Sequence, residues 1–334
     1  MLDTVTVDRR APVLDEWRAA LDPPGVPHHE AWATLDLLSA LWQPAPVGSL
    51  LTPSGAPLEF TFRSGSDALV YTAEPGQPGY SPHTKWSVIR AVTAACGMNQ
   101  PPPVGAVVEM LRQQPGQRFG CWLGVRLGSG TVSYKIYQEV TPAARDRTRC
   151  ALYAALPALD PGIAVVPQLV GHTLSDGPSE YYLRVPDPRP STLHALLRAA
   201  GVSEQLRLCS ESLAWLAGIP VTRLHERLRL GLSYRLTPDQ PPVASLFIHA
   251  VQISERNLPV RARLLELAAQ LGLDLARYAR ATAFLGEFDP VQPLHGLIGL
   301  TIEPAGRLSL SAGVSPPSLK LSCDTSAYVR PSEK

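Results

Sequence analysis

The sequence predicts an α+β fold in which ten antiparallel strands close into a barrel surrounded by α-helices. Helical segments followed by a pair of strand-like segments occur five times along the 334 residues, and such periodicity is typical of a repeated structural unit. The strands come in tight pairs joined by short turns, whereas a parallel sheet requires single alternation of strand and helix. Each strand also has one apolar face. Closure with helices outside would cover these faces and leave no open edge.

The five repeats are expected to form a single domain over residues 1–334. Their ranges are roughly 11–75, 83–140, 142–186, 191–252 and 259–315, followed by a tail at 316–334.

In the first two repeats, apolar residues at helical spacing precede segments rich in β-branched and aromatic residues. The first repeat has helical LDEWRAALD and EAWATLDLLSALW, then the strand LEFTFR, the turn SGSD and the strand ALVYTAE. The second repeat has helical KWSVIRAVTAAC and VGAVVEMLRQQ, then the strand CWLGVRL, the turn GSG and the strand TVSYKIYQEV. We therefore expect β-hairpins at 58–74 and 121–140.

The other three repeats follow the same order, the third less regularly. The third has AARDRTRCALYAAL before IAVVPQLVGHTL, SDGPS and EYYLRV. The fourth has STLHALLRAA and CSESLAWLAG before RLGLSYRL, TPDQPP and VASLFIHAV. The fifth has PVRARLLELAAQLGLDLARYARAT before HGLIGLTIE, PAG and RLSLSAGV. The five repeats therefore predict ten strands in five hairpins.

The composition argues against several classes of function. Hydrophobic residues make up 45% of the chain and charged residues 18%, so a sizeable core can be buried. The formal net charge is +1 and no basic run stands out, which argues against a nucleic-acid partner. The motifs DDxxD, GxSxG, HExxH and the P-loop do not occur. No metal site is therefore expected.

The distribution of cysteine and apolar residues predicts a cytoplasmic protein. The five cysteines are scattered and show no CxxC spacing, so they are interpreted as reduced thiols. The N-terminal MLDTVTVDRR has no apolar core of a signal peptide, and no run approaches the ~18 apolar residues of a membrane span. We expect no membrane partner.

The strand TVSYKIYQEV indicates what the inside of the barrel contains. Successive side chains of a strand alternate between its two faces. If Tyr134 and Ile136 pack under the helices, Lys135 and Tyr137 point into the lumen. A lysine in the middle of a strand is costly to bury without an anionic partner, which suggests a polar interior.

The same alternation assigns lumenal residues on the other strands. They are Glu59, Thr61 and Arg63; Ser133 and Glu139; Glu180, Tyr182 and Arg184; Ser233 and Arg235; and Ser245, Phe247, His249, His295 and Thr301. A lumen of ten strands is wide enough to hold a ligand.

Three segments resemble motifs of one family, and the resemblance extends from about residue 50 to about residue 317. The stretch PLEFTFRSGSDALVYTAEP resembles the first hairpin "P-I-E-x-S … R-Y-x-x-E-P", TVSYKIYQEV resembles a "K-x-Y" strand, and VASLFIHAVQISERN resembles "K-x-Y-x-P … N-D". These are motifs of aromatic prenyltransferases of the dimethylallyltryptophan synthase type, the ABBA or PT-barrel family. The predicted fivefold ααββ architecture is also that of this family.

The resemblance implies roles for the lumenal residues. Glu59 would accept the proton from the aromatic nucleophile. The diphosphate would be held by Lys135, Arg184, Arg235, Tyr137 and Tyr182, without a metal and with no cofactor besides the allylic diphosphate as co-substrate. The substrate-binding residues would be Thr61, Arg63, Val70, Ser133, Glu180, Ser245, Phe247, His249 and His295.

The residues themselves leave other interpretations open. Glu59 could form an ion pair with Arg63 at the rim of the barrel, and Lys135 could pair with Glu139. Tyr137 and Tyr182 could be present because aromatic residues favour strands, or because their ring faces screen a cation. Arginines at strand ends are often solvated, and lone histidines are more often polar lumen residues than metal ligands.

Two enzymatic functions and one binding function follow. The first is transfer of an allylic group from its diphosphate to an electron-rich, indole-like small molecule in secondary metabolism, by a monomer or homodimer. The second keeps the barrel without the diphosphate, as a cyclase or other non-prenylating catalyst, because Val70, Glu180 and Ser245 stand where the resemblance implies cations. The third is a ligand-binding barrel without catalysis.

Overall fold

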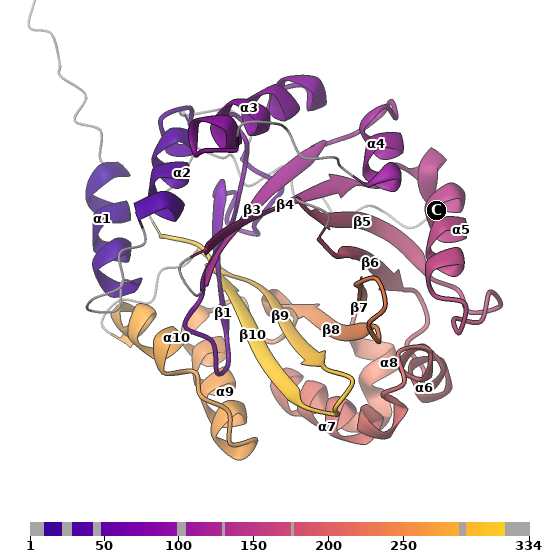
Figure 1. The fold of residues 1–334 in the computed structure, drawn as a ribbon. Helices are drawn as coiled ribbons and strands as arrows, with labels where there is room; N and C mark the ends of the chain where they lie inside the picture. Colours follow the sequence, from indigo (N-terminus) through magenta and orange to yellow (C-terminus); the bar gives the residue numbers. More distant parts are fainter. Residues whose placement is uncertain are drawn as a thin grey trace, which may run out of the picture.

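The computed structural model describes residues 10–21, 29–42, 48–98, 105–128, 131–174, 177–286 and 292–317. Within these ranges, ten strands form one closed antiparallel barrel with helices around it, as the sequence predicts (Figure 1). Consecutive strands pair with one another, and β1 (Leu58–Arg63) closes the sheet against β10 (Leu308–Val314), with Phe60 opposite Val314. The predicted tail lies outside the described residues from position 318 onward.

The strand boundaries agree with the sequence to within a few residues. The remaining strands are β2 (Leu69–Ala73), β3 (Cys121–Gly128), β4 (Thr131–Glu139), β5 (Val166–Thr173), β6 (Ser179–Val185), β7 (Leu230–Leu236), β8 (Val243–His249) and β9 (His295–Ile302).

The helices before each hairpin are less regular than the strands. They are α1 (Arg10–Leu21), α2 (His29–Ser39), α3 (Pro82–Ala95), α4 (Ala106–Arg112), α5 (Arg145–Ala155), α6 (Pro190–Ala199), α7 (Leu206–Ala217), α8 (Leu224–Arg227), α9 (Asn257–Gln270) and α10 (Ala276–Ala281). The third repeat has one α-helix, α5, preceded by a single 3₁₀ turn. The helical stretch of the fifth repeat divides into α9 and α10 around Gly272, whose φ of 64° favours glycine.

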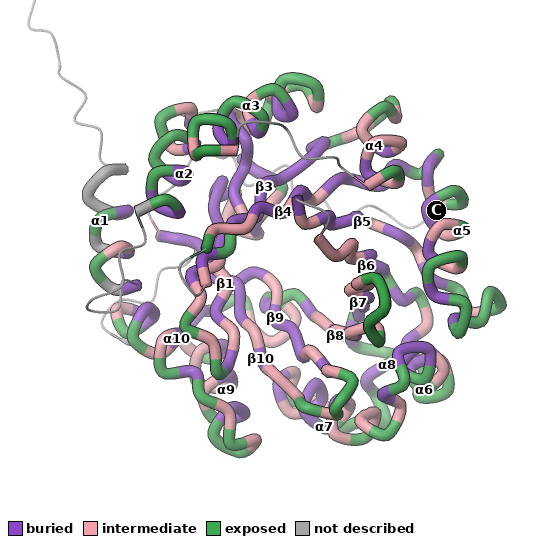
Figure 2. The backbone as a smooth tube through the Cα atoms, viewed as in Figure 1, coloured by how far each residue is buried: buried purple, intermediate pink, exposed green. Residues whose placement is uncertain are grey.

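The apolar faces of the strands pack outward against the helices. Figure 2 shows most of the barrel in the buried colour and the outer helix faces in the exposed colour. Phe60 stacks on Trp17 of α1 with ring centroids 5.1 Å apart. The Tyr71 hydroxyl donates to the Ala31 carbonyl oxygen of α2 at 2.7 Å. Burial of such large side chains is the main stabilising contribution, and it fixes which face of each strand is left for the lumen.

Two further features of the described residues concern the helices and the cysteines. No described helix combines the length and the apolar character that crossing a membrane requires. Cys96, Cys121, Cys150 and Cys209 are free thiols.

Candidate functional site

The barrel encloses a cavity of about 480 Å³, a volume typical of small-molecule sites. All ten strands contribute alternate residues to its wall. We call the end next to the hairpin turns the mouth, where Arg63, Arg126 and Arg235 lie at strand ends. We call the end near Glu59 and Phe247 the floor.

Most of the residues predicted to face the lumen line this cavity. They are Glu59, Thr61, Arg63, Val70, Ser133, Lys135, Tyr137, Glu180, Tyr182, Ser233, Arg235, Ser245, Phe247 and Thr301.

Arg184 and His249 do not line the cavity, contrary to the prediction. Both follow the lumenal alternation of their strands, but both are exposed, beyond the floor. Arg184 lies opposite Gly231, and the space above Gly231 is filled by the Phe247 ring, whose nearest carbon would be 1.9 Å from a Cβ at this position. Phe247 therefore separates this end of the barrel from the cavity.

His295 faces the helices, so its predicted lumenal position is wrong. Its Nε2 lies 2.7 Å from the Tyr278 hydroxyl of α10, and its Nδ1 lies 3.2 Å from Asn257 Oδ1 of α9. The cause is a β-bulge, because Val314 pairs with His295 whereas Ala312 pairs with Ile298. The extra residue reverses the alternation at the start of β9.

Glu59 lies on the floor of the cavity, with 8% of its surface exposed. Burial raises the pKa of this carboxyl to about 8, and a hydrogen bond with the Leu297 backbone opposes the shift. Two glycines make room for the carboxylate. A Cβ on Gly296 would lie 1.7 Å from Glu59 Oε2, and a Cβ on Gly313 would lie 2.4 Å from Glu59 Cδ.

The rim ion pair between Glu59 and Arg63 does not form. Arg63 instead pairs with Glu303 at 3.0 Å and donates to Ser309 Oγ at 3.0 Å. Glu59 is therefore a carboxyl group in a desolvated site without an ion-pair partner among the described residues, which suits it to proton transfer.

Lys135 lies in the middle of the lumen and pairs with Glu180 across β4, β5 and β6. Burial opposes its charged form, but the Glu180 carboxylate raises the pKa of Lys135. For Glu180, the effect of burial is outweighed by the Lys135 charge and by hydrogen bonds, which lower its pKa to about 2. The alternative pair between Lys135 and Glu139 does not form, because Lys135 pairs with Glu180. Glu139 accepts hydrogen bonds from the backbone N–H groups of residues 118–120, outside the cavity wall.

Glycines on neighbouring strands leave room for aromatic side chains at the cavity wall. A Cβ on Gly124 would lie 2.7 Å from the Tyr137 ring, and a Cβ on Gly171 would lie 3.3 Å from the Tyr182 ring and 2.4 Å from Lys135 Cε. The Tyr137 and Tyr182 ring centroids are 5.7 Å apart, and Lys135 Nζ lies 4.9 Å and 5.2 Å from them. These rings can stabilise a cation in the lumen.

Trp122 and Arg126 are among the cavity residues that were not assigned from the sequence. Both occupy alternate positions of CWLGVRL, so applying the alternation rule to this strand would have found them. The Trp122 indole N–H donates to Glu74 at 3.2 Å, which fixes its ring at the cavity wall. Arg126 is exposed at the mouth.

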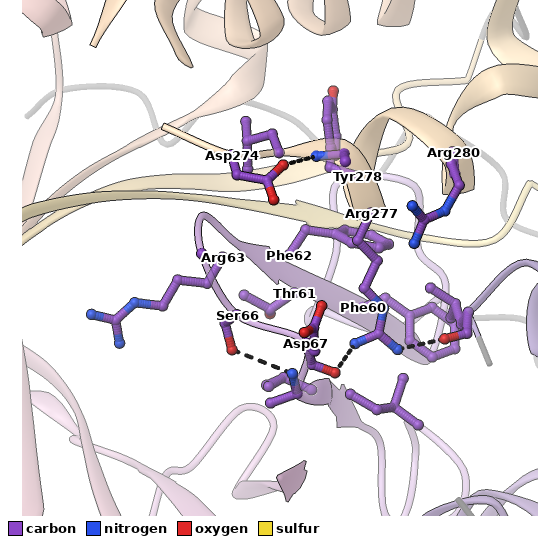
Figure 3. Close-up of a pocket in the computed structure, with 17 residues that line it drawn as sticks. Phe60, Thr61, Phe62, Arg63, Ser66, Asp67, Asp274, Arg277, Tyr278 and Arg280 are labelled. Carbon is purple, nitrogen blue, oxygen red and sulfur yellow. Dashed lines mark hydrogen bonds between the residues drawn. The ribbon is translucent and has the colours of Figure 1, made fainter. Parts of the chain in front are cut away.

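A second pocket, of about 200 Å³, lies outside the barrel between the β1–β2 turn and α10 (Figure 3). Arg277 crosses it and donates to the backbone carbonyl oxygens of Asp67 at 2.5 Å and Leu21 at 2.6 Å. In Figure 3, the Arg63 guanidinium points away from Arg277. These contacts of Arg277 join the first hairpin to α10, which is a structural role. The barrel lumen is therefore the stronger candidate for a functional site. Among the described residues, no group of three His, Cys, Asp or Glu side chains could hold a metal ion.

Solved structures share this fold. No family model and no curated protein matches the sequence. The 6-dimethylallyltryptophan synthase from Micromonospora olivasterospora, in complex with DMASPP and Trp, has a TM-score of 0.74 and 19% identity over 93% of this chain and 98% of that chain. The 5-dimethylallyltryptophan synthase from Streptomyces coelicolor has a TM-score of 0.71 and 15% identity over 92% and 96%.

A third similar structure is a ternary complex of the prenyltransferase PriB with L-tryptophan and dimethylallyl thiolodiphosphate. It has a TM-score of 0.70 and 18% identity over 91% of this chain and 95% of that chain. These structures confirm the predicted likeness in fold to the dimethylallyltryptophan synthases.

Proposed function

We propose that this protein is an aromatic prenyltransferase, which moves an allylic group from a diphosphate to an electron-rich ring such as indole. The observation that carries this proposal is the isolated Glu59 carboxyl on the floor of an aromatic-walled cavity with arginines at its mouth. The shared fold supports it, because the similar enzymes are solved with tryptophan and an allylic diphosphate analogue.

The proposed chemistry needs cations that hold the diphosphate, aromatic rings that screen the allylic cation, and a base. The C–O bond of the allylic diphosphate breaks, and the diphosphate leaves with the bonding electrons. The allylic cation, screened by Tyr137 and Tyr182, is attacked by a ring carbon of the acceptor. Glu59 then takes the proton from that carbon and restores aromaticity. The enclosed barrel limits capture of the cation by water.

Glu59 must be ionised to accept this proton. With a pKa of about 8, roughly one tenth of the free protein has the carboxylate at pH 7. The cationic intermediate favours the ionised form when it develops beside the carboxylate.

The remaining features of the proposal follow from the sequence. Basic side chains would supply the charge that holds the diphosphate, without a metal ion or a further cofactor. We also propose a cytoplasmic location, a role in secondary metabolism, and a monomeric or homodimeric state.

One observation favours a second candidate, a non-prenylating cyclase that acts on a preformed intermediate in the lumen. Glu180 neutralises Lys135, and Val70 and Ser245 are uncharged where the resemblance implies cations. Fewer cations are thus free in the middle of the lumen than a diphosphate would need there.

Titration calorimetry with dimethylallyl diphosphate in the presence of EDTA separates the two candidates. The prenyltransferase is expected to bind the diphosphate without a metal and, with tryptophan or indole, to form a product heavier by one dimethylallyl group. The Glu59→Gln variant, which is expected to bind the diphosphate but to turn over ~10² to 10⁴ times more slowly, serves as control. Absence of diphosphate binding to the folded wild type would rule out prenyl transfer and favour the cyclase.

A further inference from the structure

We propose that the diphosphate binds at the mouth of the barrel, on Arg126, Arg235 and Arg63, and not on Lys135 in the middle of the lumen. This inference rests on the proposed prenyl transfer and assigns its leaving-group site. It keeps Arg235 from the assignment that the family resemblance implies, but replaces Lys135 and Arg184 with Arg126 and Arg63.

Lys135 already has its partners. Its ammonium group binds the Glu180 carboxylate and donates to the Tyr182 hydroxyl at 3.0 Å. Glu180 is held in turn by Ser233 Oγ at 2.6 Å. A diphosphate at Lys135 would face the Glu180 carboxylate at close range, and like charges repel strongly where water is excluded.

The mouth has cations without such partners. Among the described residues, Arg126 and Arg235 form no ion pair, and both line the cavity. Arg63 pairs with Glu303, but Glu303 is shared with Arg307, whose Nε lies 2.9 Å from it. Positive charge therefore exceeds negative charge at this end, as an anion site requires.

The three arginines line the same cavity. Burial lowers the pKa of Arg63 first, and the charges of Arg235, Arg126 and Arg307 lower it further. Arg126 lies opposite Val70 on β2, and Arg235 lies opposite Glu180 on β6. The cations that the resemblance implies at positions 70 and 180 are thus each supplied by the neighbouring strand. Guanidinium groups bind phosphate oxygens through paired hydrogen bonds.

This placement orders the reactants along the barrel axis. Arg63 lies four positions after Glu59 on β1, which corresponds to about 13 Å of strand. With the diphosphate at the mouth, the allylic carbon points inward and the aromatic acceptor lies between it and Glu59. The C–O bond then breaks toward the mouth, the new C–C bond forms in the middle, and the proton leaves toward the floor.

The test uses inorganic pyrophosphate as the probe, titrated into the full chain with EDTA present. We expect Arg126→Gln and Arg235→Gln each to weaken binding by about tenfold, because each removes one charge-assisted contact. Arg198→Gln, an exposed arginine on α6, is the matched control and is expected to leave the affinity unchanged. Lys135→Met combined with Glu180→Gln removes the lumenal pair without net charge change, and is expected to alter the affinity by less than about threefold.

Several results would overturn the assignment. They are no pyrophosphate binding to the wild type, unchanged affinity in both arginine variants, or a large loss in the Lys135/Glu180 variant. If that double variant does not fold, the two arginine variants decide alone. Turnover assays distinguish the two proposals. Pyrophosphate binding at the arginines without product formation refutes prenyl transfer only, whereas product formation with arginine-independent binding refutes the mouth site only.

Discussion

Glu59 has the environment of a proton acceptor, since it is buried, flanked by glycines and unpaired. Glu59→Gln preserves the size and most hydrogen bonds of the side chain but removes the base. Turnover is therefore expected to fall by ~10² to 10⁴ while substrate affinity changes little. Steady-state kinetics and calorimetry on the same variant measure both quantities. Activity within a few-fold of wild type, with the fold intact, would show that another group is the base.

The same residue predicts a pH dependence of the reaction. Burial raises the pKa of Glu59 to about 8, and the ionised form is the one that accepts a proton. The value of kcat/KM is expected to rise with pH and level off above about pH 8. A profile measured on wild type and Glu59→Gln checks this. If kcat/KM of the variant still rises with pH, another group is responsible for the pH dependence.

Glu59 is also expected to lower stability at high pH. Its pKa is raised from 4.5 to about 8 in the folded state, so the folded chain retains a proton that the unfolded chain releases. The stabilisation is full below the lower value and is lost as pH rises through the higher one. As the pH rises from about 5 to about 9, the free energy of unfolding of wild type is thus expected to fall relative to that of Glu59→Gln. The change in this difference is on the order of a few kcal/mol. Denaturant titrations at both pH values measure it, and an unchanged difference would contradict the desolvated carboxylate.

At the scale of the element, the bulge at the start of β9 decides where His295 points. His295→Ala removes contacts with Tyr278 and Asn257 and leaves a buried hydroxyl without this partner. A loss of about 2 to 3 kcal/mol in the free energy of unfolding is expected, with ligand affinity unchanged.

His249 provides the matched comparison for His295, because the sequence predicts that both histidines face the lumen. It is exposed at the end of β8, and His249→Ala is expected to change stability by less than about 0.5 kcal/mol. Urea titration of both variants checks the contrast. Equal effects would mean that His295 does not hold α9 and α10 to the barrel.

At the scale of the whole molecule, closure makes the first and last strands of the barrel depend on each other. β1 pairs with both β2 and β10, so residues about 250 positions apart are neighbours in one sheet. We predict that the chain unfolds as a single domain, in one cooperative transition by calorimetry and by circular dichroism. Two resolved transitions, or a fragment of the first two repeats that folds alone, would contradict this.

The sequence by itself determined the hairpins and the faces of most strands. Alternation of apolar and polar residues is a local property, and each apolar face can be buried in only one direction. This is why Lys135, Glu180 and Arg235 were placed in the lumen correctly. The likeness in fold followed from the order of the elements.

Only the tertiary structure decided which side chains interact and where each residue lies along the barrel axis. The Lys135–Glu180 pair joins strands that are far apart in sequence, so neither residue alone reveals it. A bulge of one residue turned His295 outward, and Phe247 over Gly231 separated Arg184 from the cavity. Such contacts depend on register and on the closure of the barrel. Local alternation fixes the face of a side chain, but the position along the barrel and the neighbours across it arise only when all ten strands meet.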